Sequence, residues 1–78
     1  MNVKQFLTKA IDENKGYYIC WIWLNNSILV TGKCEDVYFN LSATIDNVII
    51  DSGKIIDNDR DIDIHLDIDS FKEHYKLI

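Results

Sequence analysis

The chain has 78 residues, 47% of them hydrophobic and 12% aromatic, and it contains no proline. This composition excludes a solvated, disordered tail, and the length suits one compact domain over residues 1–78 with a single core. The net charge of −5 arises in residues 46–69, where eight aspartates accompany only Lys54 and Arg60, so direct binding of nucleic acid through a basic surface is not expected.

The first predicted element is an amphipathic helix over residues 3–14. Asn2 and Gln5 form a weak variant of the capping box at its start, and Gly16 supplies a left-handed residue after its end. Five apolar residues recur at the spacing of one helical face and are expected to enter the core. They are Val3, Phe6, Leu7, Ala10 and Ile11.

Two strands joined by a tight turn are predicted next, over residues 17–24 and 28–32. Asn25 and Asn26 between them suit a two-residue turn. Both faces of this hairpin are apolar. The expected register pairs Trp23 with Ile28, Trp21 with Val30, and Ile22 with Leu29.

Short apolar runs and alternating residues predict the rest of the sheet, and a second capping box at Ser70 and Glu73 opens a closing helix. The fold class is therefore α+β, a five- to six-stranded antiparallel sheet with the N-terminal helix packed on one face and a short C-terminal helix. The remaining strands are expected at 37–44, at 48–51 and 54–57 as a hairpin around Ser52 and Gly53, and at 61–68. The closing helix is expected to carry Phe71, Tyr75 and Ile78 on one side.

The segment from residue 57 to residue 69 has an acid at nearly every odd position and, from Ile62 on, an aliphatic residue at every even one. Strict alternation is typical of a half-buried strand, so the even-numbered aliphatic residues should face the core and the odd-numbered residues should face outward. Because a strand advances about 3.4 Å per residue, same-face carboxylates recur roughly every 6.8 Å and repel one another. The predicted partner-binding row is Asp57, Asp59, Asp61, Asp63, His65, Asp67 and Asp69.

This spacing is close to the through-space separation of phosphates along one strand of B-DNA, which is roughly 7 Å. The leading hypothesis is a small inhibitor that mimics nucleic acid and occupies the basic channel of a nucleic-acid-binding protein, such as a nuclease or effector complex. In design it is similar to inhibitors that phages and mobile elements encode, including anti-CRISPR, anti-restriction and uracil-glycosylase inhibitor proteins. The abundance of Ile, Asp and Asn is typical of AT-rich coding sequence, which fits a phage source.

The acidic row has two other interpretations. One is an edge strand blunted by charge or the solvated face of an ordinary sheet. The other is metal binding, since Asp57, Asp59 and Asp61 match the opening of a calcium loop. That loop requires Gly where Ile62 stands and a bidentate Glu where Ile68 stands, so neither a metal nor a cofactor is predicted.

The titratable side chains give no pattern of a catalytic site. His65 has no identifiable nucleophile beside it, and His74 has no ligand-spaced companion. Cys20 is interpreted as a buried apolar residue and Cys34 as an ordinary thiol, which suits a reducing, cytoplasmic compartment. The start of the chain shows no signal peptide, and the longest apolar run, residues 17–24, is too short to cross a bilayer. The chain is not expected to be an enzyme.

The aromatic residues of the first hairpin predict a second interface. One helix covers only one face of the sheet, so Trp21, Trp23 and Tyr17 would remain available to a partner or to a second copy of the chain. The alternative function is therefore an acidic protein-interaction module, such as an immunity protein or antitoxin, or a domain that forms a homodimer through its aromatic face.

Overall fold

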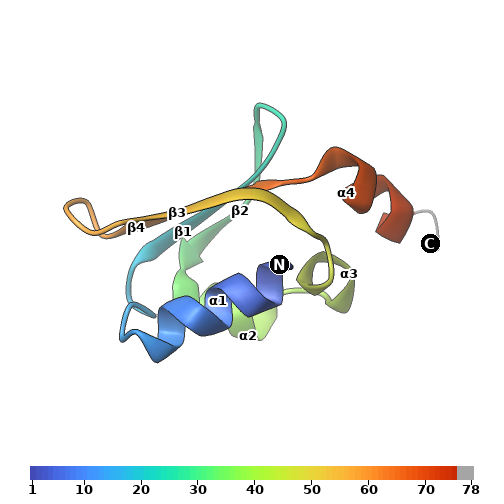
Figure 1. Cartoon of the computed structure of the whole chain (residues 1–78). Helices are drawn as coiled ribbons and strands as arrows, with labels where there is room; N and C mark the ends of the chain where they lie inside the picture. The colour runs from blue at the N-terminus through green and yellow to red at the C-terminus, as the bar shows by residue number, and fades with distance from the viewer. Residues whose placement is uncertain (76–78) are drawn as a thin grey trace.

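Four strands form one mixed sheet in the computed structural model, which describes residues 1–75 (Figure 1). The strands are β1 (Ile19–Leu24), β2 (Ser27–Lys33), β3 (Ile50–Ile56) and β4 (Asp61–Leu66). The helices of this part of the chain are α1 (Val3–Asp12), α2 (Cys34–Asn40), α3 (Ala43–Asp46) and α4 (Ile68–Tyr75). The α+β class is confirmed, while the prediction of five to six antiparallel strands is wrong.

The strand order is β2-β1-β4-β3, with β1 and β4 side by side and parallel at the centre. The outer strands pair antiparallel with them, β2 with β1 and β3 with β4. The sheet therefore consists of two hairpins joined through their inner strands. The chain between β2 and β3 crosses from one edge of the sheet to the other and forms α2 and α3 on the way.

Helices α1 and α2 lie on the same face of the sheet, as Figure 1 shows. The apolar side of α1 is buried as predicted, except that Ile11 is only partly buried. Alternate residues of the two inner strands complete the core, because successive strand residues point to opposite faces. The fully buried strand residues are Cys20 and Ile22 of β1, and Ile62 and Ile64 of β4.

The start of α1 agrees with its predicted capping box, and its end differs. The backbone N–H of Gln5 donates to Asn2 Oδ1 at 2.8 Å, and the backbone N–H of Asn2 donates to Gln5 Oε1 at 2.9 Å. The helix ends at Asp12, and the left-handed residue is Asn14, with a φ of 63°. Gly16 instead allows a close approach, because an added Cβ would lie 3.3 Å from Glu35 Oε2.

The hairpin of β1 and β2 has the predicted turn but a shifted register. Asn25 is left-handed, with a φ of 55°, and Trp23 pairs with Ile28 as expected. Leu29 then has no partner across the hairpin, which is a β-bulge. The extra residue shifts the later pairs by one position, so Ile22 pairs with Val30 and Trp21 with Thr31.

The strand predicted at 37–44 is wrong, because this segment forms α2 and α3. Glu35 and Asp36 occupy the first turn of α2, where acidic side chains favour a helix start. Val37 is buried in the core, whereas Phe39 is 80% exposed. Two residues at positions i and i+2 would share a face in a strand, but a helix separates them.

The hairpin predicted around Ser52 and Gly53 is also wrong, because β3 runs through both residues. Gly53 faces α1, and a Cβ built on it would lie 2.5 Å from Phe6 Cε2. This glycine therefore allows helix and sheet to approach closely, and it does not form a turn.

The acidic strand is shorter than predicted. β4 ends at Leu66, and Asp67 precedes α4, which begins two residues before the predicted cap at Ser70. The Ser70 amide donates to Asp67 Oδ1 at 2.9 Å, so Asp67 has the role of the capping residue. Phe71 and Tyr75 stack with ring centroids 4.3 Å apart, and Ile78 lies outside the described residues.

The close approach at Gly53 gives a first prediction. Gly53→Ala should lower the free energy of unfolding by about 1–3 kcal/mol, because the new methyl group overlaps the Phe6 ring. Urea denaturation of both proteins measures the loss. Phe6→Leu in the Gly53→Ala background should cost less than Phe6→Leu alone, and Ser52→Ala is the exposed control. A Gly53→Ala variant as stable as the parent would contradict this packing.

Candidate functional site

The face of the sheet opposite α1 and α2 carries the candidate site. We name it the open face and define it by Trp21 and Trp23 of β1 with Asp61, Asp63 and His65 of β4. These residues alternate with the buried residues of the two inner strands. None of the described helices packs over this face (Figure 1).

Each tryptophan of the open face is hydrogen-bonded to an aspartate of the neighbouring strand. Trp21 Nε1 donates to Asp61 Oδ1 at 3.3 Å, and Trp23 Nε1 donates to Asp63 Oδ1 at 2.6 Å. The parallel register places Trp21 beside Asp63 and Trp23 beside His65. Each indole thus reaches back by two residues along β4. The acidic row and the aromatic face, predicted as separate interfaces, meet in one surface.

His65 completes the second of these pairs. Its ring lies nearly parallel to the Trp23 indole, with an interplanar angle of 8° and centroids 5.8 Å apart. His65 Nε2 is 3.5 Å from Asp63 Oδ2, which makes an ion pair when the imidazole is protonated. Trp23 is therefore the partner of one oxygen of Asp63, and protonated His65 is the partner of the other.

A hollow of about 290 Å³ lies between the two tryptophans and the aspartates Asp61 and Asp63. Ile28 of β2 and Ile56 of β3 extend its apolar wall from the outer strands. An apolar hollow with a few oriented polar groups is the usual form of a binding site in proteins. Its lining residues are Trp21, Trp23, Ile28, Ile56, Asp61 and Asp63. Ile28 and Ile56 were not predicted, although each alternates with core-facing residues of its strand.

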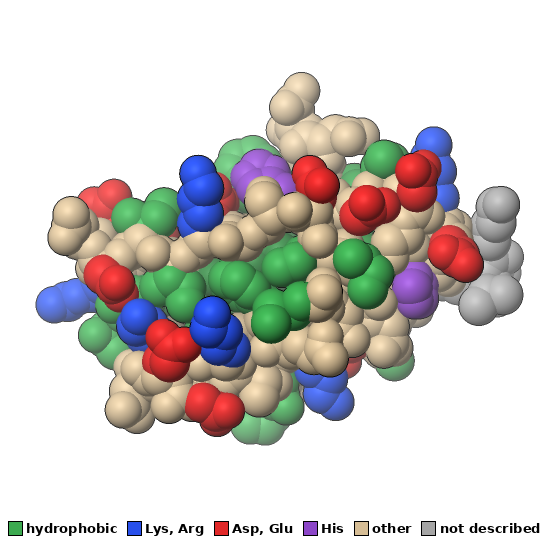
Figure 2. Space-filling model, in the orientation of Figure 1, with side chains coloured by type: hydrophobic (Ala, Val, Ile, Leu, Met, Phe, Trp, Pro, Cys, Tyr) green, Lys and Arg blue, Asp and Glu red, His purple; other side chains and the backbone are tan. Residues whose placement is uncertain are grey.

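The rest of the predicted acidic row lies elsewhere. Asp59 is exposed in the turn between β3 and β4, and Asp57 contacts the loop after α1. Asp67 and Asp69 lie at the start of α4, where they line a second hollow of about 490 Å³ together with Glu73 and His74. On the face shown in Figure 2, acidic side chains are interspersed with basic ones. The row is thus reduced to Asp61, Asp63 and His65.

Tyr17, the third predicted aromatic contact, does not line the hollow between the tryptophans. Its side chain is 53% exposed, and its ring packs edge-on against Tyr18 at a centroid distance of 5.0 Å. The Arg60 guanidinium lies 5.9 Å from the Tyr17 ring centroid. Tyr17 therefore belongs to a different part of the surface.

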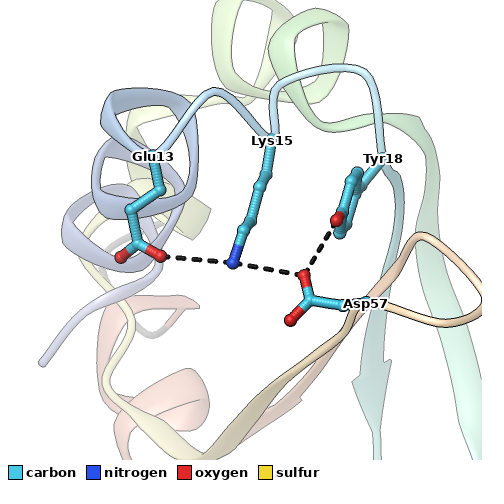
Figure 3. Close-up of polar contacts among 4 residues, drawn as sticks. All are labelled: Glu13, Lys15, Tyr18 and Asp57. Carbon is cyan, nitrogen blue, oxygen red and sulfur yellow. Dashed lines mark hydrogen bonds and ion pairs between the residues drawn. The ribbon is translucent and has the colours of Figure 1, made fainter.

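Asp57 is neutralised by groups of the protein itself (Figure 3). Its Oδ1 accepts a hydrogen bond from the Tyr18 hydroxyl at 2.8 Å and lies 3.2 Å from Lys15 Nζ. Lys15 Nζ also lies 3.3 Å from Glu13 Oε1. The bond from Tyr18, and next the bond from Lys15, lowers the pKa of Asp57. The contact with Asp57 is also the main cause that raises the pKa of Tyr18 and of Lys15.

The two cysteines are buried free thiols. Burial raises the pKa of Cys20 to about 12 and that of Cys34 to about 11. Since the thiolate is the reactive form, neither side chain is suited to act as a nucleophile. The interpretation of Cys20 as a buried apolar residue is confirmed, while Cys34 is a core residue at the start of α2.

Within residues 1–75, no three His, Cys, Asp or Glu side chains gather in an arrangement that could hold a metal ion. The described helices are all too short or too polar to cross a membrane. Comparisons with protein family models, with curated proteins and with solved structures found no match. The candidate site therefore rests on the geometry of the open face.

The contacts of Asp57 give a second prediction. Asp57→Asn should lower the stability, because it removes the charge that Lys15 and Tyr18 contact. The folded-state pKa of Asp57 lies below its usual value of 3.8. Its contribution is therefore complete above that value and is lost as the pH falls through the lower, folded-state pKa.

The alkaline limit follows from the two partners, whose pKa values are raised. Their contribution is complete below the usual Tyr value of 10.0 and is lost as the pH rises through the raised values. Urea unfolding measured across the pH range should show the largest difference in stability between parent and variant between pH 3.8 and pH 10.0. Asp59→Asn, which removes an exposed charge, is the control. A difference independent of pH would contradict the assignment.

Proposed function

We propose that the protein is a small non-enzymatic inhibitor that binds a basic surface of a nucleic-acid-binding enzyme with the open face of its sheet. The observation that carries this proposal is the pair of Trp–Asp hydrogen bonds between β1 and β4. They combine aromatic surface with carboxylates held in defined positions. Tryptophans in such settings contribute a large share of the energy of protein interfaces.

The charge of the chain supports a basic partner. A net charge of −5 on a chain of this size steers positively charged surfaces toward it. The aspartates of the open face are well placed to make the contact after this encounter, since each is oriented by an indole N–H. The buried thiols, with their raised pKa values, favour a binding role over nucleophilic catalysis.

The mimicry of nucleic acid that we propose involves fewer carboxylates than the sequence predicts. Asp61 and Asp63 are two residues apart on one face of a strand, a spacing of roughly 6.8 Å, which is similar to that of neighbouring phosphates. They would occupy two adjacent phosphate sites of the target, and the tryptophans would add apolar contact beside them. Inhibitors of the anti-CRISPR or anti-restriction kind, encoded by phages and active in the cytoplasm, are the class we propose.

The third prediction tests the open face directly. The double variant Asp61→Asn, Asp63→Asn should capture far less of the partner from a host lysate at low ionic strength than the parent does. The parent should release the partner as salt is raised, because salt screens exposed charges. Mass spectrometry identifies the captured proteins, and duplex DNA added to the complex should displace the inhibitor from a nucleic-acid-binding enzyme.

The matched control is the double variant Asp51→Asn, Asp59→Asn, which removes the same charge outside the hollow. It should behave like the parent if the position of the carboxylates decides binding. Equal loss in both double variants would show that net charge alone acts, and would contradict the proposed site. Capture of a basic toxin that DNA does not displace would favour the immunity-protein alternative.

Self-association is a second candidate, favoured by the edge of the sheet at β2. Ile28 and Leu29 of this edge strand are 45% and 40% exposed, and β2 has a charged residue only at its end, Lys33. Uncharged apolar edges of this kind pair readily with other strands. Sedimentation of the parent should then show a dimer, and Leu29→Lys should shift it to monomer. If the dimer forms through the aromatic face instead, Trp23→Phe should be the variant that shifts it to monomer.

A further inference from the structure

We propose that the hollow beside Trp21 and Asp61 receives an arginine side chain. This inference rests on the proposed function, and it names the group of the partner that the open face recognises. The guanidinium would lie against the Trp21 indole and donate to the Asp61 carboxylate. The residues that support this assignment are the two Trp–Asp pairs themselves.

The molecule already holds one such arrangement, formed by Trp23, Asp63 and His65. The indole of Trp23 donates to one oxygen of Asp63, and the flat imidazole of His65 stacks on that indole. The imidazole also reaches the other oxygen of Asp63. A planar nitrogen base, an indole face and a carboxylate thus assemble at one end of the open face.

Trp21 and Asp61 repeat two of these three components, two residues earlier on both strands. Trp21 Nε1 donates to Asp61 Oδ1, as in the first group. The register partner of Trp21 is Asp63, so β4 places an acid where the first group has an imidazole. None of the ion pairs among residues 1–75 involves Asp61. No described residue adds a planar base to this pair, and an arginine of the partner would supply it.

The neighbouring strand does not supply a cation to Asp61 either. Lys54 of β3 pairs in register with Asp63, whereas the partner of Asp61 is Ile56. Ile56 gives the hollow an apolar wall at this point. Asp61 therefore has an indole on one side and an aliphatic side chain on the other, and its Oδ2 accepts no hydrogen bond from a described residue.

Arginine matches this environment better than lysine. Its guanidinium is planar, stacks on aromatic rings, and donates in a fork that fits a carboxylate. A lysine ammonium is a compact, strongly hydrated charge without a flat surface. The aliphatic part of an arginine side chain would contact Ile56, the register partner of Asp61, as long charged side chains do on apolar surfaces. A hollow of about 290 Å³ has room for such a side chain.

The fourth prediction uses N-acetyl-arginine amide as the probe. The chain has two tryptophans, so two indole N–H signals report on the site in a heteronuclear NMR spectrum. Trp21→Phe identifies the signal of Trp21 by its loss. The arginine amide should shift this signal more, at equal concentration and ionic strength, than N-acetyl-lysine amide or the uncharged citrulline amide.

Asp61→Asn is the decisive variant, and Asp59→Asn is its matched control. The arginine amide should bind Asp61→Asn about three- to fivefold more weakly than the parent, as expected for one exposed ion pair. Asp59→Asn should bind it like the parent. The dispersion of the amide signals shows whether each variant is folded.

Equal shifts with the three amides, or an unchanged affinity in Asp61→Asn, would overturn the assignment of an arginine site. The partner capture described above fails or succeeds separately. Capture that depends on Asp61 and Asp63, without a preference for the arginine amide, would leave the proposed function standing and remove this inference. If the arginine amide binds specifically but partner capture does not depend on Asp61 and Asp63, the arginine site would stand and the proposed function would be removed.

Discussion

The parallel pairing of β1 with β4 is the constraint on which the rest of the structure depends. It brings together two segments about forty residues apart in the chain, from Ile19 beside Asp61 to Trp23 beside His65. On one side of the sheet it joins the buried halves of both hairpins into a single core. On the other side it places indole N–H groups within reach of carboxylates. One pairing therefore determines both the stability of the molecule and its candidate site.

The two faces of the sheet show how the same residues serve packing and recognition. The aliphatic residues of β4 are buried on the face of the sheet that α1 and α2 cover, so the hydrophobic effect holds the strand in place (Figure 1). The alternate residues are then presented in fixed positions on the open face. Because Gly53 lets Phe6 approach the sheet closely, the helix layer is tightly packed beneath this surface. A rigid support of this kind reduces the entropy lost on binding.

Local features of the fold could be predicted from the sequence, and long-range ones could not. The capping box of α1 and the turn at Asn25 depend on neighbouring residues and were predicted correctly. Residues 37–44 alternate like a strand, but the acidic first turn of α2 and the burial of Val37 favour a helix over that pattern. Asp67 fits both the alternation of β4 and the cap of α4, so the sequence pattern alone does not define where the strand ends. For the site, the outward direction of Asp61, Asp63 and His65 was predictable, while their contact with Trp21 and Trp23 depends on a pairing that no local pattern encodes.

The central pair of strands is also the pairing that costs the most chain entropy to form. Each hairpin closes a short loop, whereas joining β1 to β4 closes a long one, and the entropy cost grows with loop length. Because both Trp–Asp bonds join β1 to β4, a chain in which the two hairpins are not paired with each other has no recognition surface. A ligand of the open face would bind only the completed sheet. By mass action, such a ligand would therefore stabilise the junction between the two hairpins of the protein.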